Sequence, residues 1–151
     1  MSLSLVLIPL SIAVAAASQA RQIRPSDVEA GNEVRVESRM RDETLLVAAL
    51  EDLGATVRRA DDGVLLAKTP DRALTMRRDA AGLWNACFAG TWTPDGASAF
   101  VEDLDRAYGL QVQRAVIRRL EERAPEAGMR ITSQSVDDDR VVTLVMEVER
   151  A

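Results

Sequence analysis

The stretch VRRADDGVLLA, residues 57–67, decides the fold. Asp-Gly is a favoured pair at the turn of a β-hairpin, and here Asp62-Gly63 separates two short runs of strand-forming residues. The pattern predicts a hairpin with strands over residues 57–60 and 64–67. Two further hairpins are predicted by the same kind of signal, over 73–77 with 83–88 and over 129–135 with 141–148. The run 141–148 is apolar on both faces, which is typical of a central strand.

Helical patterns lie between these hairpins. Asp42 precedes a run with apolar residues at helical spacing over residues 45–53, so Asp42 is predicted as the N-cap and Gly54 as the end of this helix. Phe100, Leu104 and Tyr108 share one face of a second helix. Gly109 is expected to break that helix. The third helix buries the residues Val112, Ala115, Val116, Ile117 and Leu120.

Residues 34–38 alternate with strand period and open the domain. The order of elements is then β-α-ββ-ββ-α-α-ββ, preceded by an apolar N-terminal helix. This order predicts an α+β fold with one mostly antiparallel sheet and helices packed on one face. The expected division of the chain is an apolar helix over 1–20, a linker over 21–32 and the α+β domain over 33–151.

The first twenty residues contain no charged residue. Three interpretations remain open: a membrane anchor, a helix at the core of an oligomer, and a secretory signal peptide that lacks the usual positive start. The residues expected to make membrane or assembly contacts are Leu3, Leu5, Val6, Leu7, Ile8, Leu10, Ser11, Ile12, Val14 and Ala15. If the segment is an anchor, Arg21 and Arg24 behind it place the following domain in the cytoplasm, at the inner membrane.

Composition excludes several kinds of chemistry. The chain has no histidine and one cysteine, Cys87, which excludes histidine-based metal sites, Ser-His-Asp catalysis and an intramolecular disulfide. A net charge of −5 disfavours nonspecific binding of nucleic acid. We therefore expect no catalytic residue, no cofactor, no metal and no nucleic-acid partner.

Three arginine pairs stand out, at residues 58–59, 77–78 and 118–119. Arg58 and Arg77 lie on neighbouring predicted hairpins, so they are candidates for one basic surface that binds an anion or a partner. Trp92 lies in a loop-like stretch and is a candidate anchor for a partner.

Carboxylate groups are weaker candidates. Glu102 and Asp105 can share a helix face, whereas Glu51 and Asp52 are adjacent and cannot. The run 137–139 lacks the glycine and distal glutamate of a calcium loop, so a polar hairpin tip is expected there.

Residues 36–148 resemble the uncharacterised DUF1257 family of plastids and cyanobacteria. The resemblance is carried by the stretches MRDETLLVAALEDLGATV (40–57), LWNACFAGTWT (83–93) and RITSQSVDDDRVVTLVMEV (130–148), and by the order of the elements. It implies no catalytic residues, and it implies an accessory role near AAA-type ATPases. The apolar N-terminal segment is a departure from the family.

The expected function is that of a non-enzymatic accessory or scaffold protein. Its apolar N-terminus would provide membrane attachment or self-assembly, and its α+β domain would bind a protein partner, with a homo-oligomer expected. The alternative is a small regulatory domain that binds an anion or a nucleotide through its arginine pairs.

Overall fold

The hairpin predicted at residues 57–67 is present in the computed structural model, which describes residues 2–7, 33–90 and 92–149. Its strands pair antiparallel, with Arg59 opposite Leu65. Gly63 adopts a φ of 78°, which strains any residue with a Cβ, and the Val64 N–H donates to the Asp62 carboxylate at 3.2 Å. The turn residues therefore direct the chain back on itself as expected.

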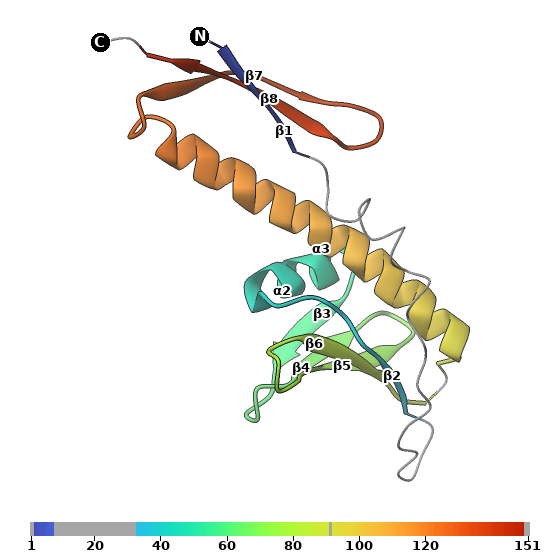
Figure 1. Cartoon of the computed structure of the whole chain (residues 1–151). Helices are drawn as coiled ribbons and strands as arrows, with labels where there is room; N and C mark the ends of the chain where they lie inside the picture. Colours follow the sequence, from blue (N-terminus) through green and yellow to red (C-terminus); the bar gives the residue numbers. More distant parts are fainter. Residues whose placement is uncertain (1, 8–32, 91, 150–151) are drawn as a thin grey trace. The chain divides into compact units, whose positions relative to one another are not determined.

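The other two predicted hairpins and the first predicted helix are confirmed within two residues at each end. The elements of the described residues are β1 (Ser2–Leu7), β2 (Val34–Val36), α2 (Glu43–Asp52), β3 (Thr56–Arg59), β4 (Leu65–Lys68), β5 (Ala73–Arg78), β6 (Trp84–Phe88), α3 (Pro94–Arg123), β7 (Met129–Val136) and β8 (Val142–Val148). Figure 1 shows them along the chain. The α+β class is therefore confirmed.

The prediction of one sheet is wrong, because the described strands form two. One sheet has the order β2-β6-β5-β4-β3 and the other has the order β1-β8-β7, and every pairing is antiparallel. The chain accordingly divides into two compact units: of the described residues, 33–90 and 92–108 belong to one unit, and 2–7 with 109–149 belong to the other. We call them the five-stranded unit and the three-stranded unit. Hydrophobic periodicity identifies strands, but it does not identify their partners, which long-range hydrogen bonds select.

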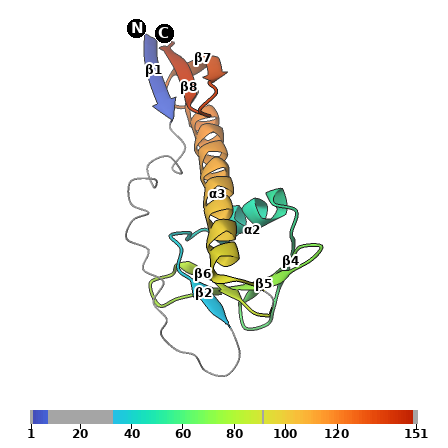
Figure 2. The ribbon, with the colours of Figure 1, turned by 90° about the vertical axis from the view of Figure 1, so that its right-hand side faces the viewer.

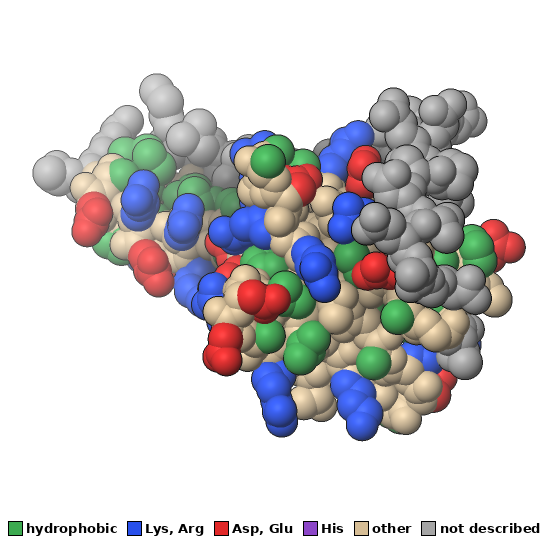
Figure 3. All heavy atoms as spheres, turned by 90° about the horizontal axis from the view of Figure 1, so that it is seen from below, with side chains coloured by type: hydrophobic (Ala, Val, Ile, Leu, Met, Phe, Trp, Pro, Cys, Tyr) green, Lys and Arg blue, Asp and Glu red, His purple; other side chains and the backbone are tan. Residues whose placement is uncertain are grey.

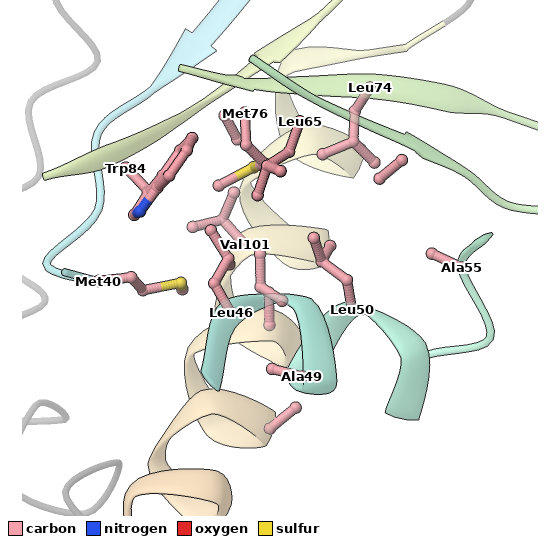
Figure 4. Close-up of a cluster of buried hydrophobic side chains, with 14 of the residues drawn as sticks. Met40, Leu46, Ala49, Leu50, Ala55, Leu65, Leu74, Met76, Trp84 and Val101 are labelled. Carbon is pink, nitrogen blue, oxygen red and sulfur yellow. The ribbon is translucent and has the colours of Figure 1, made fainter. Parts of the chain in front are cut away.

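The five-stranded unit buries one face of its sheet under α2 and the first half of α3 (Figure 1). Figure 4 shows labelled side chains of this core, among them Leu46, Leu50 and Met76, meeting between the helices and the strands. The largest fully buried side chains of the unit are Met40, Leu46, Leu50, Leu65, Met76, Trp84, Phe88, Val101 and Leu104. Helices on one face of this sheet are therefore confirmed. The burial of these apolar side chains is the main source of the unit's stability.

The predicted ends of α2 are confirmed. The Asp42 carboxylate accepts from the Leu45 N–H at 3.0 Å, and Gly54 follows the helix with a φ of 81°. The Tyr108 hydroxyl accepts from the backbone N–H groups of Arg41 and Asp42, at 3.3 and 3.1 Å. Tyr108 therefore joins the start of α2 to α3.

The predicted break at Gly109 is wrong. Helix α3 runs without interruption from Pro94 to Arg123 and replaces the second and third predicted helices. One glycine costs a helix interior about 1 kcal/mol, which the surrounding good helix formers and tertiary contacts offset. The predicted buried face of the third helix is also wrong, because Val116 is 37% exposed and the other four residues of that face are only half-buried.

In the three-stranded unit the central strand is β8, as its apolar sequence predicts. Val142, Leu144 and Met146 alternate along β8 and are buried. Figure 1 and Figure 2 both show β1 beside β8, and this pairing joins the two ends of the chain.

A helix was expected over residues 1–20, and the part of this segment that the structure describes, residues 2–7, forms the strand β1 instead. The remainder, including Ile8, Leu10, Ser11, Ile12, Val14 and Ala15, lies outside the described residues. The sequence contains a signal for the strand, since Leu3, Leu5 and Leu7 alternate with Ser2, Ser4 and Val6. These leucines are in register with Met146, Leu144 and Val142, the buried residues of β8.

Among residues 2–7, 33–90 and 92–149, no helix combines the length and the hydropathy needed to cross a membrane.

Candidate functional site

Two arginine pairs of the five-stranded unit are each divided between the two faces of the sheet. Arg59 makes a two-point ion pair with the Glu43 carboxylate of α2, at 3.0 and 3.1 Å. Arg78 donates to the Arg41 carbonyl at 3.2 Å, and its guanidinium lies 4.9 Å from the centre of the Trp84 ring. The second arginine of each pair is therefore held on the side of the helices.

Arg58 and Arg77 extend from the opposite face, because successive side chains of a strand alternate between faces. The strand register confirms that the two arginines share this face. Arg58 is opposite Leu66 of β4, and Leu66 is opposite Thr75 of β5. Arg77 lies two residues beyond Thr75 on β5 and therefore on the same face. Both arginines are exposed, and neither guanidinium makes an ion pair or a hydrogen bond with another described residue.

Lys68 belongs to the same face, two residues beyond Leu66 on β4, and it is also exposed. We call Arg58, Lys68 and Arg77 the outer basic face. Figure 3 views the molecule from this side and shows Lys and Arg side chains among apolar and backbone atoms. Strands hold the three Cα positions in a rigid arrangement, so the basic groups are partly preorganised for an anionic ligand.

Acidic residues surround the outer basic face at the ends of the strands. Asp61 and Asp62 occupy the turn between β3 and β4, Asp71 the turn between β4 and β5, and Asp79 the turn between β5 and β6. Their negative charges weaken the potential of the basic face at distances beyond about 10 Å, where salt screening is also strong. Attraction to an anion is therefore concentrated at short range.

Trp92 does not join the outer basic face. Its ring packs edge-on against Phe88 and Phe100 on the helix side, with centroids 4.7 and 5.5 Å apart, and its indole N–H donates to the Ala73 carbonyl at 2.9 Å. The Arg72 guanidinium covers the ring at 4.7 Å. These contacts give Trp92 a structural role in closing the core, while its use as a partner anchor stays a prediction.

Trp84 lies deeper and is only 1% exposed. Its indole N–H is a buried donor without a hydrogen-bond partner in the described part of the chain. Figure 4 shows the ring within the apolar cluster, beside Met40. The packing of the ring therefore outweighs the cost of this donor, which is about 1–3 kcal/mol.

A polar network that the sequence analysis missed ties β6 to the approach to α2. The buried Asn85 side chain accepts from the Ser38 N–H at 3.0 Å and donates to the Asp79 carboxylate at 3.2 Å. The Ser38 hydroxyl donates to the Trp84 carbonyl and accepts from the Met40 N–H at 3.2 Å. The turn between β5 and β6 brings Asp79 close to Asn85 locally, whereas only the fold brings Ser38, 47 positions away, to Asn85.

Asp79 is held in its charged form by hydrogen bonds. The Leu83 N–H, at 2.9 Å, is the main reason that the pKa of Asp79 lies below its ordinary value of 3.8, and the Asn85 amide and the Ala81 N–H add to the effect. A depressed pKa means that the folded state favours the carboxylate. The stabilisation is present above pH 3.8 and is lost as the pH falls through the lower folded-state pKa.

Asp79→Asn is therefore expected to lower the stability of the protein at pH 7, and the difference from wild type is expected to shrink as the pH falls below about 4. Urea denaturation at several pH values measures both effects. Asp61→Asn is the control, since Asp61 is exposed in the turn between β3 and β4 and its replacement should leave stability at pH 7 unchanged. A constant difference between Asp79→Asn and wild type down to pH 2 would contradict the assignment.

The other carboxylate candidates are not brought into a metal site. Glu102 and Asp105 lie on α3, Glu51 and Asp52 near the end of α2, and Asp137 accepts from the Val141 N–H at 2.8 Å within its own hairpin turn. No group of three or more metal-ligating side chains is found in the described ranges 2–7, 33–90 and 92–149. The hairpin-tip interpretation of residues 137–139 is consistent with this geometry.

Comparison of the chain with models of protein families, with curated proteins and with solved structures found no match. The resemblance to DUF1257 stays a prediction.

Proposed function

We propose that this chain is a non-enzymatic accessory protein that binds an acidic segment of a partner protein at the outer basic face. One observation carries the proposal: Arg59 and Arg78 are tied to the helix side, whereas Arg58 and Arg77 extend from the other face without a charged partner in the described residues. Exposed guanidinium groups on strands are well suited to two-point hydrogen bonding with carboxylates.

The arrangement favours a short acidic segment over an extended polyanion. Two arginines and one lysine offer a small number of contacts, and the aspartates at the strand ends repel a long chain of negative charge. The net charge of −5 adds long-range repulsion towards nucleic acid. An AAA-type ATPase system, which the DUF1257 resemblance implies, is one source of such a partner.

Arg58→Ala combined with Arg77→Ala is expected to weaken binding of a fluorescein-labelled, Asp/Glu-rich peptide by about 5–30-fold. Each exposed charge contact is worth about 0.5–1 kcal/mol, and two of them are removed. Fluorescence anisotropy of the peptide, titrated with full-length protein at low and at high salt, measures the change. Added salt should weaken the wild-type interaction more than that of the variant.

The matched control is Arg118→Ala combined with Arg119→Ala, which removes the same charge from an exposed part of α3. Equal weakening by both variants, or no binding by wild type, would contradict the proposal. ATP and GTP are tested in parallel by thermal shift. Stabilisation by a nucleotide that depends on Arg58 and Arg77, without peptide binding, would replace the proposed function by the regulatory nucleotide-binding one.

A further inference from the structure

No described strand pairs with the outer edge of β7, the last strand of the three-stranded sheet. β7 spans Met129–Val136, it is at one edge of the order β1-β8-β7, and six of its eight side chains are exposed. An edge strand presents a row of unpaired N–H and C=O groups to any strand that can lie beside it. β7 is therefore the longest template for strand pairing among the described strands.

β7 carries little of the protection that edge strands usually have. Arg130 is its one charged residue, and it contains no proline or lysine. A bulge between Ile131 and Ser133 interrupts its beginning, which leaves Ser133–Val136 as a regular, uncharged run. By comparison, the edges β2 and β3 of the other sheet have three and four residues, and β3 ends in two arginines.

The charges around β7 favour a second copy of the chain in one orientation. Arg130, near the start of the strand, is exposed and lies 3.7 Å from the Glu147 carboxylate of β8. Asp137, Asp138 and Asp139 follow the end of the strand, partly offset by Arg140. An antiparallel pair of β7 strands centred on Gln134 places Arg130 of each copy opposite Asp138 of the other. A parallel pair would instead place arginine beside arginine and aspartate beside aspartate, which is destabilising.

An exposed apolar side chain supports the same occupant. Val136 is 60% exposed, the highest value among the large apolar side chains of the described residues. It is in register with Val142, which is 3% exposed on β8. β7 covers one side of Val142, and a further strand beside β7 would cover Val136 in the same way. The burial of this apolar side chain would then stabilise the association in addition to the backbone hydrogen bonds between the strands.

We propose that two copies of this chain associate through an antiparallel, two-fold pairing of their β7 strands. The two three-stranded sheets then form one continuous six-stranded sheet, in which the same surface of each copy contacts the other. This inference uses residues remote in sequence from Arg58, Lys68 and Arg77, and it does not depend on the proposed binding of an acidic partner.

The test uses sedimentation of the full-length chain over a hundredfold range of concentration. The wild type is expected to rise from the 16.5 kDa of one chain towards twice that mass. Ser133→Lys combined with Ser135→Lys is expected to weaken association by about tenfold or more, because antiparallel pairing places these positions opposite each other and like charges repel. Ser133→Glu combined with Ser135→Glu should act in the same way.

Mixing the lysine and glutamate variants provides the decisive result. The opposed charges then attract, so the mixture should form a dimer while each variant alone stays largely monomeric. Circular dichroism melting is used to check that both variants are folded. The control is Thr56→Lys combined with Ala99→Lys, which adds the same positive charge as the lysine variant at exposed positions of the five-stranded unit. A wild type that is monomeric at every concentration, or a mixture that does not associate, would overturn the proposal.

Discussion

Replacing Phe88 by alanine is expected to lower the free energy of unfolding by about 3–5 kcal/mol. Phe88 is fully buried on β6, where it pairs with Leu74 of β5 and with Val34 of β2. Its ring also contacts the rings of Trp92 and Phe100, with centroids 4.7 and 6.0 Å apart. Alanine would leave a cavity where strand and helix meet, and rigid strands close such a cavity poorly.

Urea denaturation followed by circular dichroism measures this loss, and tryptophan emission should shift because Trp92 loses its nearest ring. Val148→Ala is the control, since that side chain is 44% exposed and should change stability by less than about 1 kcal/mol. A Phe88→Ala protein as stable as wild type would show that β6 is not at the centre of the core.

Replacing Leu50 by alanine is expected to cost about 2–5 kcal/mol of unfolding free energy. Leu50 is on α2, has no exposed surface and belongs to the cluster between α2 and the five-stranded sheet (Figure 4). Alanine is a good helix former, so the helix itself is retained and the loss reports packing. Thermal and urea denaturation should agree on the size of the effect.

The matched comparison is Leu66→Ala, on β4. Leu66 is 41% exposed on the outer face of the same sheet, so its truncation should cost well under half as much as that of Leu50. Equal losses for the two leucines would mean that the outer face is covered in solution. That outcome would also weaken the proposal that Arg58 and Arg77 are free to bind a partner.

Local signals in the sequence were sufficient to predict most of the individual helices and strands. Asp62-Gly63, Gly82 and Gly54 identify turns and a helix end because glycine accepts a positive φ at little cost, and Asp42 identifies a helix start because its carboxylate can accept from a free N–H. These features depend on residues within a few positions of one another. For the same reason they were predicted with nearly correct boundaries.

The same local reasoning failed where two competing signals were close in strength. Gly109 is a weak helix breaker, and the contacts of α3 outweigh it. In the apolar N-terminal segment, the high hydropathy of residues 3–17 concealed the alternation in residues 2–7, which form β1 against β8. A period of two over six residues is too short a signal to compete with a long apolar run.

By itself, the sequence determined the α+β class, the three hairpins, the caps of α2 and the presence of arginine pairs on neighbouring strands. Only the tertiary structure decided that the strands form two sheets, that β1 completes the second of them, and that Arg59 and Arg78 are bound to the helix side while Arg58 and Arg77 are exposed. The physical reason is the range of the interactions. Turns and caps form within a few residues, whereas the choice of strand partners and of the buried face depends on groups far apart in the chain that meet only on folding.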